Sequence, residues 1–196
     1  MLQQTQVSTA TPYFKRFIKE FPNVKKLAET NLDHVLSHWS GLGYYARARN
    51  IYEAAKIISS KHKGKVPNSL EELISLPGIG KSTAGAILAL GYKKKAAILD
   101  GNVKRVLARH RKIEGELSLP STTKNLWQIS EKLLPNDQID VYTQSIMDLG
   151  ATVCTKSNPT CEHCPVNQDC LALTQGLVET LPTKSKSKPK PIKKVF

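Results

Sequence analysis

All four cysteines of this chain lie in one loop, at Cys154, Cys161, Cys164 and Cys170, with the spacing Cys-x6-Cys-x2-Cys-x5-Cys. Thiolates this close in sequence can converge on one centre, and soft sulfur ligands select zinc or iron–sulfur clusters. Proline, asparagine and serine between the cysteines form turns, so the loop can wrap around such a centre. The loop therefore predicts a metal centre.

Two other uses of the cysteines have to be weighed. Paired disulfides suit small secreted domains, but the sequence from Met1 to Gln6 has neither the charged nor the apolar region of a secretory leader. Structural zinc sites usually combine two Cys-x2-Cys pairs, and here only Cys161 and Cys164 form one. The spacing alone leaves zinc and iron–sulfur both open.

The charge balance points to a polyanionic partner. Lysine and arginine number 29 against 16 acidic residues, which gives a formal net charge of +13. Such an excess favours nucleic acid. Part of it comes from a lysine-rich end, but the remainder of the chain is basic as well. No apolar run is long enough to span a membrane, Met1–Gln6 does not resemble a leader, and clustered thiols suit a reducing compartment, so we expect a cytoplasmic protein.

Apolar residues recur at helical spacing through most of the chain, and the 40% hydrophobic content is sufficient for a core, which predicts an all-α fold. Only the run 96–99 is strand-like, and it is too short to build a sheet. Besides short helices after Asn23 and Asn31, we expect helices around Phe14–Phe21 and over Ala46–Lys61, Ser69–Ser75, Lys81–Leu90, Asn102–His110, Thr123–Leu134 and Asp140–Leu149.

Some details of these helices can be predicted as well. Phe14, Phe17, Ile18 and Phe21 are spaced to lie on one face of a helix. In the helix 46–61, we expect an inward face that includes isoleucine and alanine side chains, at Ile51, Ala54, Ala55 and Ile58. The N-caps are predicted to be asparagines, at Asn23, Asn31 and Asn68.

The turn between two predicted helices has the sequence Leu-Pro-Gly-Ile-Gly-Lys, with Gly78, Gly80 and Lys81. The glycines permit a tight turn, and the N-terminus of the following helix exposes N–H groups that can hold a phosphate. This pattern is typical of a DNA-binding helix-hairpin-helix, although an ordinary turn between helices is also compatible with it. Farther along, Asp100 precedes a helix, where it is either an N-cap or a carboxylate that stabilises a developing cation.

These motifs, in this order, resemble the helix-hairpin-helix, Gly-Pro-Asp base-excision glycosylases with an iron–sulfur loop. Within that family the chain is similar to the adenine DNA glycosylases of the MutY type. The resemblance covers about residues 1–182 and is carried by four segments, Met1–Val7, Gly41–Asn50, Ile98–Arg109 and Met147–Ala151.

The resemblance implies an all-α, two-lobed fold with a [4Fe–4S] cluster on the four cysteines. One lobe holds the hairpin and the other holds the chain ends and the cluster loop. The implied partner of this expected monomer is double-stranded DNA containing adenine opposite 8-oxoguanine or guanine. In this family Asp100 matches the catalytic carboxylate, and Asn102 matches a polar residue that holds the site. Tyr44 matches a residue that wedges beside the oxidised base. Gln3 or Gln4 falls in the stretch that fills the gap in the base stack. Without the resemblance, Tyr44 could be a core residue and the glutamines solvent-facing.

Ser82 separates this chain from the endonuclease III type, which carries a Schiff-base lysine at the matching position. The resemblance therefore implies a monofunctional hydrolase in which Lys81 contacts phosphate, and it opposes a glycosylase with lyase activity.

Two parts of the family pattern are expected to be missing. The general-acid glutamate of the family stands just before the Met1–Gln4 run, and no acid occurs here before Glu20. The family's C-terminal domain, which reads 8-oxoguanine, is not expected either. We therefore expect a truncated member with impaired catalysis, or a non-catalytic DNA-binding module. Its parts are a glycosylase domain at 1–153, a cluster loop at 154–170 and a basic, disordered tail or linker at 182–196.

Overall fold

The computed structural model describes residues 1–183, and within them all regular elements are helices. An isolated bridge between Glu116 and Thr183 is the only strand-like pairing in that range. The all-α prediction is confirmed. The chain divides into two compact units, Met1–Ala84 and the residues from Gly85 onward, as expected for a two-lobed fold.

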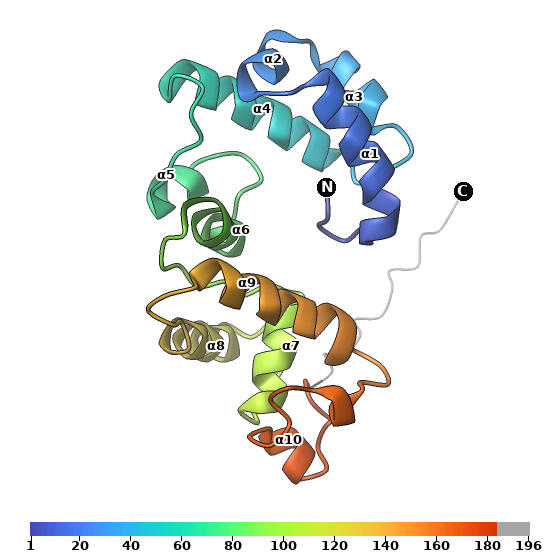
Figure 1. The fold of residues 1–196 in the computed structure, drawn as a ribbon, viewed down its shortest axis with the longest axis vertical. Coiled ribbons are helices and arrows are strands. Elements are labelled where there is room, and N and C mark those ends of the chain that lie inside the picture. Colours follow the sequence, from blue (N-terminus) through green and yellow to red (C-terminus); the bar gives the residue numbers. More distant parts are fainter. Residues whose placement is uncertain (184–196) are drawn as a thin grey trace, which may run out of the picture. The chain divides into compact units, whose positions relative to one another are not determined.

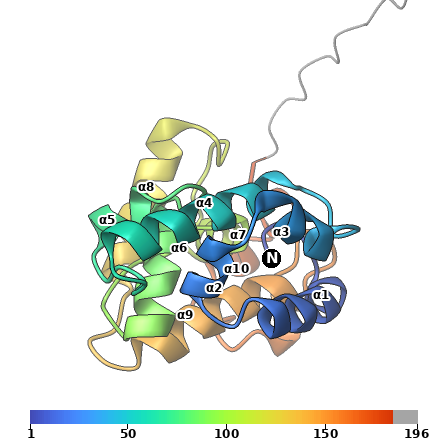
Figure 2. The same cartoon turned by 90° about the horizontal axis from the view of Figure 1, so that it is seen from above.

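Unit 1 is built around a long central helix. α4 (Ala46–Lys61) contacts α2 (Val24–Glu29) and α3 (Leu32–Trp39), and α1 (Val7–Glu20) packs on α3, as Figures 1 and 2 show. The unit ends with α5 (Leu70–Ile74) and the start of α6 (Lys81–Ala86). Its core centres on Trp39 and Val35, which are almost fully buried.

The four residues predicted to share one helix face near Phe17 differ in burial, and the predicted inward face of α4 is partly wrong. In α1, Phe17 and Phe21 are buried, but Phe14 and Ile18 are 52% and 45% exposed. The buried stripe runs instead through Ala10 and Phe17, because α3 meets α1 on that side. In α4, Ile51 is exposed; the buried residues are Ala48, Ala54, Ala55 and Ile58.

Three N-caps were predicted, and two are confirmed. The Asn23 and Asn31 side chains accept hydrogen bonds from the backbone N–H groups of Lys26 and His34. The third prediction, Asn68, is wrong: Ser69 caps α5 by accepting from the N–H of Glu72 and donating to its carboxylate at 2.8 Å. A serine three residues before a glutamate has the capping-box spacing, and Asn68 stands one residue before the N-cap.

Unit 2 is a bundle of α7 (Gly101–His110), α8 (Pro120–Lys132) and α9 (Ile139–Asp148). Each lies within a few residues of its prediction. The remaining helical turns are η1 (Ile87–Gly91), η2 (Leu149–Val153), η3 (Cys161–His163) and α10 (Leu171–Thr174). Val103, Leu107 and Leu126 form the buried centre.

The predicted helix 81–90 is not one regular helix. It is α-helical only to Ala86 and then widens into the π-helical turn η1. Gly85 explains the close packing here, since a Cβ at this position would lie 2.1 Å from the carbonyl oxygen of Ala97. The segment 96–99 lies outside the regular elements; Ser130 donates to the Ile98 carbonyl at 2.8 Å, and Ile98 and Leu99 are buried in the core.

The beginning of the predicted tail is held by unit 2. The hydroxyl of Thr183 accepts a hydrogen bond from the N–H of Gly115, and Leu181 is buried. The rest of the predicted tail, 184–196, lies outside the described residues.

Candidate functional site

Arg47 organises the first residues of unit 1. Its guanidinium donates to the backbone carbonyls of Met1 and Gln3 and to the hydroxyl of Thr5. These bonds hold residues 1–5 against the start of α4, and the Gln3 amide then reaches the Thr83 hydroxyl of α6 at 3.5 Å. The N-terminus thus lies in the unit that also contains the hairpin, so the expectation that both chain ends share the other lobe is wrong.

Tyr44 is exposed and not a core residue. It has a positive φ of 50° and 61% of its surface is accessible, while the neighbouring Leu42 fills the core. The Arg47 guanidinium lies 5.3 Å from the Tyr44 ring centroid and so positions the ring. Gln3 and Gln4 are also exposed, and Gln4 has a φ of 58°. The three residues present polar and aromatic surface on unit 1.

The hairpin turn adopts the predicted tight geometry. Gly78 has a φ of 77°, which favours glycine, and a Cβ there would lie 2.8 Å from Asn50 of α4. Gly80 and Lys81 are exposed at the start of α6, and Ser82 is half-buried. The turn therefore presents backbone N–H groups and a lysine at a helix start, which is an arrangement that can bind phosphate.

Asp100 caps α7 in unit 2. Its Oδ1 accepts hydrogen bonds from the backbone N–H groups of Asn102 and Val103 at 2.8 and 2.9 Å. The two capping bonds use one carboxylate oxygen, and the side chain is half-buried. The N-cap prediction for this residue is confirmed, and the same bonds fix the position of the carboxylate.

Arg105 joins Asn102 to the segment that enters the cysteine loop. It donates to Asn102 Oδ1 at 2.9 Å, to the Cys154 carbonyl at 2.8 Å and to the Gly150 carbonyl. Burial lowers the pKa of Arg105, and nearby Cys154 and Asp100 partly oppose that shift. Gly150 lies close to Asn102. Only glycine fits there, because a Cβ at position 150 would lie 2.7 Å from the Asn102 side chain.

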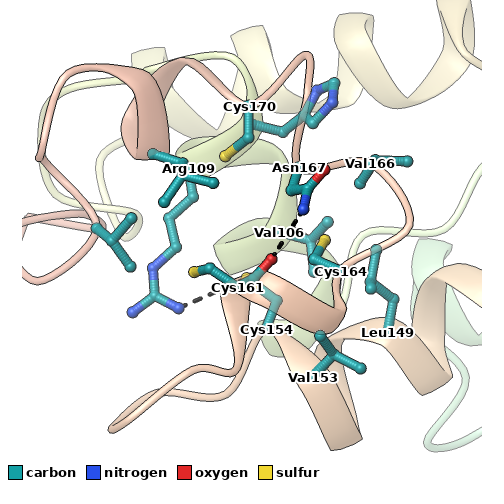
Figure 3. Close-up of a pocket in the computed structure, with 13 residues that line it drawn as sticks. Val106, Arg109, Leu149, Val153, Cys154, Cys161, Cys164, Val166, Asn167 and Cys170 are labelled. Carbon is teal, nitrogen blue, oxygen red and sulfur yellow. Dashed lines mark hydrogen bonds between the residues drawn. The ribbon is translucent and has the colours of Figure 1, made fainter.

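The four cysteine thiols meet around one pocket, as predicted. Figure 3 shows them turned toward a common space, and none of them forms a disulfide. Besides Arg109, His110 and Asn167, aliphatic side chains line the pocket: Val106 of α7, Leu149 and Val153 of η2, Val166 of the loop, Leu173 of α10, and Val178. Four converging sulfur ligands in an apolar pocket fit a thiolate-bound metal centre.

Arg109 supports this cysteine pocket from α7. It is only 3% exposed, and it donates to the carbonyls of Leu181 and Thr155 at 2.8 and 2.6 Å. Its Nη1 also lies 3.5 Å from Cys154 Sγ. The buried guanidinium therefore places a positive charge beside sulfur ligands that become negative when they bind a metal.

The electrostatics agree with thiols that line the same pocket. Burial raises the pKa of the Cys161 thiol, the neighbouring cysteines raise it further, and Arg109 opposes them. Deprotonated thiols this close together would repel one another. A metal ion that replaces the thiol protons would remove that repulsion, because its positive charge offsets the thiolates.

Three arginines were not predicted as site residues. Arg47, Arg105 and Arg109 all use buried or half-buried guanidinium groups to bind backbone carbonyls. The four-residue interval between Arg105 and Arg109 puts both on one side of α7 and could have signalled their shared role.

Among residues 1–183, no helix is both long and apolar enough to cross a membrane.

Comparison with known proteins places this geometry in context. A family model described as HhH-GPD superfamily base excision DNA repair protein matches residues 1–136. The adenine DNA glycosylase of Buchnera aphidicola subsp. Acyrthosiphon pisum is 48% identical over 193 residues, 98% of this chain and 55% of the relative. That of Buchnera aphidicola subsp. Baizongia pistaciae is 51% identical over 170 residues, 87% of this chain and 48% of the relative. The chain thus spans about half the length of these curated relatives.

A solved structure supports the fold independently. A thermostable thymine-DNA glycosylase superposes with a TM-score of 0.79 at 26% identity, over 89% of this chain and 80% of that chain. The family match covers most of the chain and includes both the hairpin and Asp100. The chain therefore belongs to the HhH-GPD superfamily of base excision DNA repair proteins.

Proposed function

We propose that this protein is an adenine DNA glycosylase that hydrolyses the N-glycosidic bond of adenine opposite 8-oxoguanine or guanine in double-stranded DNA. The observation that carries the proposal is the Asp100 carboxylate, fixed by two backbone N–H groups at the start of α7. The similarity to adenine DNA glycosylases over nearly the whole chain supports the same substrate. A nucleoid-associated cytoplasmic monomer fits this role.

The chemistry requires the adenine to leave the base stack. The N-glycosidic bond then breaks, adenine departs with the bonding electron pair and takes up a proton, and water adds to the oxocarbenium-like sugar and gives up a proton. A fixed carboxylate stabilises that positive charge without reorganising. Asp100 supplies the negative charge. Arg105 donates to Asn102 Oδ1 and so holds the polar Asn102 side chain close to Asp100. Tyr44, Gln3 and Gln4 are proposed to contact the opened duplex, and Gly78, Gly80 and Lys81 to bind its phosphates.

We further propose a hydrolase without lyase activity. A Schiff base needs a lysine amine at the reacting sugar, and Ser82 stands where the lyase-type relatives carry that lysine. Borohydride treatment during the reaction should trap no covalent protein–DNA adduct. A trapped adduct would instead support a glycosylase with lyase activity.

The four cysteines are proposed to hold a [4Fe–4S] cluster. When bound, such a cluster cross-links the loop 154–170 through its sulfur ligands, and Arg109 offsets the negative charge of those ligands. Purified protein should contain iron and acid-labile sulfide in equal amounts. Zinc without sulfide would support a structural zinc site instead.

The glycosylase proposal is tested by single-turnover excision from a duplex with adenine opposite 8-oxoguanine. Asp100→Asn should lower the rate by about 100- to 1000-fold, the typical effect of removing one preorganised electrostatic group. Asparagine is an equally good N-cap, so unfolding and duplex binding should remain close to those of the parent. Asp137→Asn removes an exposed carboxylate from the same unit and is the matched control.

Equal rates in the parent and Asp100→Asn would contradict the role of Asp100. Duplex binding without any excision by the parent would instead favour a DNA-binding module that locates mispairs without cutting. That second function rests on the hairpin turn, which exposes Gly80 and Lys81 at the start of α6 whether or not Asp100 acts in catalysis.

A further inference from the structure

Glu20, His34 and His38 form a cluster in unit 1 that has no part in the sites described above. Glu20 ends α1, and the two histidines lie one turn apart on α3. One oxygen and two ring nitrogens from the three residues all lie within 4.8 Å of one another. The His34 Nε2 is 3.4 Å from the Glu20 Oε1, and all three side chains are half-buried.

The Nδ1 nitrogen of each imidazole is already engaged. His38 Nδ1 lies 3.0 Å from the backbone carbonyl of His34, and because a carbonyl can only accept, Nδ1 carries the proton. His34 Nδ1 lies 3.0 Å from the Thr30 hydroxyl, which can accept in the same way. Both rings can therefore direct an unprotonated Nε2 toward an ion, as the second shell of metal-binding histidines does.

The surrounding residues hold the rings in place. Phe21 packs edge-on against both imidazoles, with centroid distances of 5.4 Å to each. Arg16 donates to the His38 carbonyl and so joins α1 to the end of α3. Because these contacts already restrict the rings, little conformational entropy remains to be lost when an ion binds.

The cluster adjoins an open pocket of about 200 Å³, lined by Glu20, Phe21, Lys26, Glu29, Thr30 and His34. Two of these residues are carboxylates and one is a lysine, so the charge is weakly favourable for a cation. The opening gives an ion a path from solvent and leaves room for water as a further ligand.

We propose that Glu20, His34 and His38 bind a zinc ion, independently of the cysteine loop and of the proposed function. Two imidazoles and one carboxylate with an open fourth position form a ligand set that zinc accepts. Tetrahedral zinc needs about 3.4 Å between ligand atoms, so small side-chain rotations complete the site. The ion would join the last turn of α1 to α3 and stabilise unit 1.

The test is zinc binding by the full chain with its cysteine centre loaded, measured by competition with a chromogenic zinc chelator. The parent should bind one zinc per chain beyond any metal in the cysteine loop. His34→Gln, His38→Gln and Glu20→Gln should each weaken that binding more than the roughly 10- to 100-fold typical of second-shell changes. Zinc should also raise the thermal midpoint of the parent but not of these variants.

His62→Gln is the matched control, because His62 faces Glu72 at 3.9 Å without a second imidazole nearby, and it should bind zinc like the parent. Thr30→Val keeps all three ligands but removes the partner of His34 Nδ1, so it should weaken binding while the fold is retained. Circular dichroism identifies any variant that fails to fold. The proposal is overturned if the parent binds no additional zinc, or if the three ligand variants bind it as tightly as the parent.

Discussion

At the residue scale, side chains with a special conformation or a buried charge determine the local geometry of each site. Gly78 permits the hairpin turn to approach Asn50, Asp100 fixes the start of α7, and Arg109 joins α7 to the cysteine loop. Each acts through backbone groups, so substitutions at these positions should change structure and function together unless the new side chain can make the same bonds.

Substitution of two glycines can distinguish the cost of a steric clash from the cost of backbone strain at positive φ. Gly78→Ala and Gly64→Ala both place a Cβ at positive φ, 77° and 75°, which costs roughly 1–2 kcal/mol. Only Gly78→Ala also meets Asn50, since nothing lies within 4 Å of a Cβ at Gly64. We expect urea unfolding to show a larger loss of stability for Gly78→Ala, and duplex affinity to fall only there. Equal effects of both variants would contradict this account of the hairpin.

Removal of the buried Arg109 guanidinium should lower the stability of the cysteine loop. Arg109→Gln loses charged hydrogen bonds to the Leu181 and Thr155 carbonyls, which are worth about 1.5–3 kcal/mol each. Unfolding followed by circular dichroism under anaerobic conditions should show this loss, together with faster release of the bound metal. Exposed Arg111 provides the control Arg111→Gln, which should remain within about 0.5 kcal/mol of the parent. A stable Arg109→Gln variant would show that the guanidinium is dispensable.

At the scale of elements, capping and packing determine where helices begin and which faces they bury. Ser69 starts α5 through a capping box, and α9 begins with an acidic residue, Asp140, in its first turn. An acidic side chain there interacts favourably with the helix dipole. Lys93, just after η1, lies 3.4 Å from the Asp140 carboxylate and links two elements of unit 2.

The Asp140 contact predicts a pH dependence of stability. Burial raises the pKa of this carboxyl, but the Val141 N–H and the Lys93 ammonium outweigh it, so the net pKa lies below the ordinary aspartate value. A carboxyl with a lowered folded-state pKa stabilises the fold above its unfolded-state pKa. That contribution is lost as the pH falls from about 4 through the lower folded-state value.

Urea unfolding of the parent and Asp140→Asn should therefore differ at neutral pH and converge in acid. High salt should reduce the neutral-pH difference, because Lys93 is largely exposed. Asp137→Asn serves as the control for removal of a nearby carboxylate. A difference between the parent and Asp140→Asn that does not change with pH would contradict the assignment.

At the scale of the whole molecule, the net charge of +13 and the two-unit helical architecture suit a polyanionic partner. Phosphate binding releases condensed counterions, so the logarithm of duplex affinity should fall linearly with the logarithm of salt concentration. The slope should be about −0.9 for each phosphate neutralised. Fluorescence anisotropy across a salt series measures the slope, and Lys81→Ala should reduce it by about one phosphate. A flat response would contradict binding through basic side chains.

Much of the fold and part of the candidate site could be predicted from the sequence, because their signals are local. The helices follow from apolar spacing, the cysteine centre from four thiols in one loop, and the Asp100 cap from its place before α7. Such patterns depend on residues within about one helical turn or one loop. The error at Ile51 arose because spacing identified an apolar residue but not the side on which a neighbouring helix would pack.

Only the tertiary structure decided which residues far apart in the sequence contact each other. Arg109 binds a carbonyl 72 positions away, and Arg47 binds one 44 positions away. Glu20 meets His34 and His38 only because α1 packs on α3. A backbone carbonyl exists at every position, so no sequence pattern marks which one an arginine will reach. The sequence by itself determined the helices, the cysteine centre and the capping carboxylate, and the packing of helices decided which charged side chains meet.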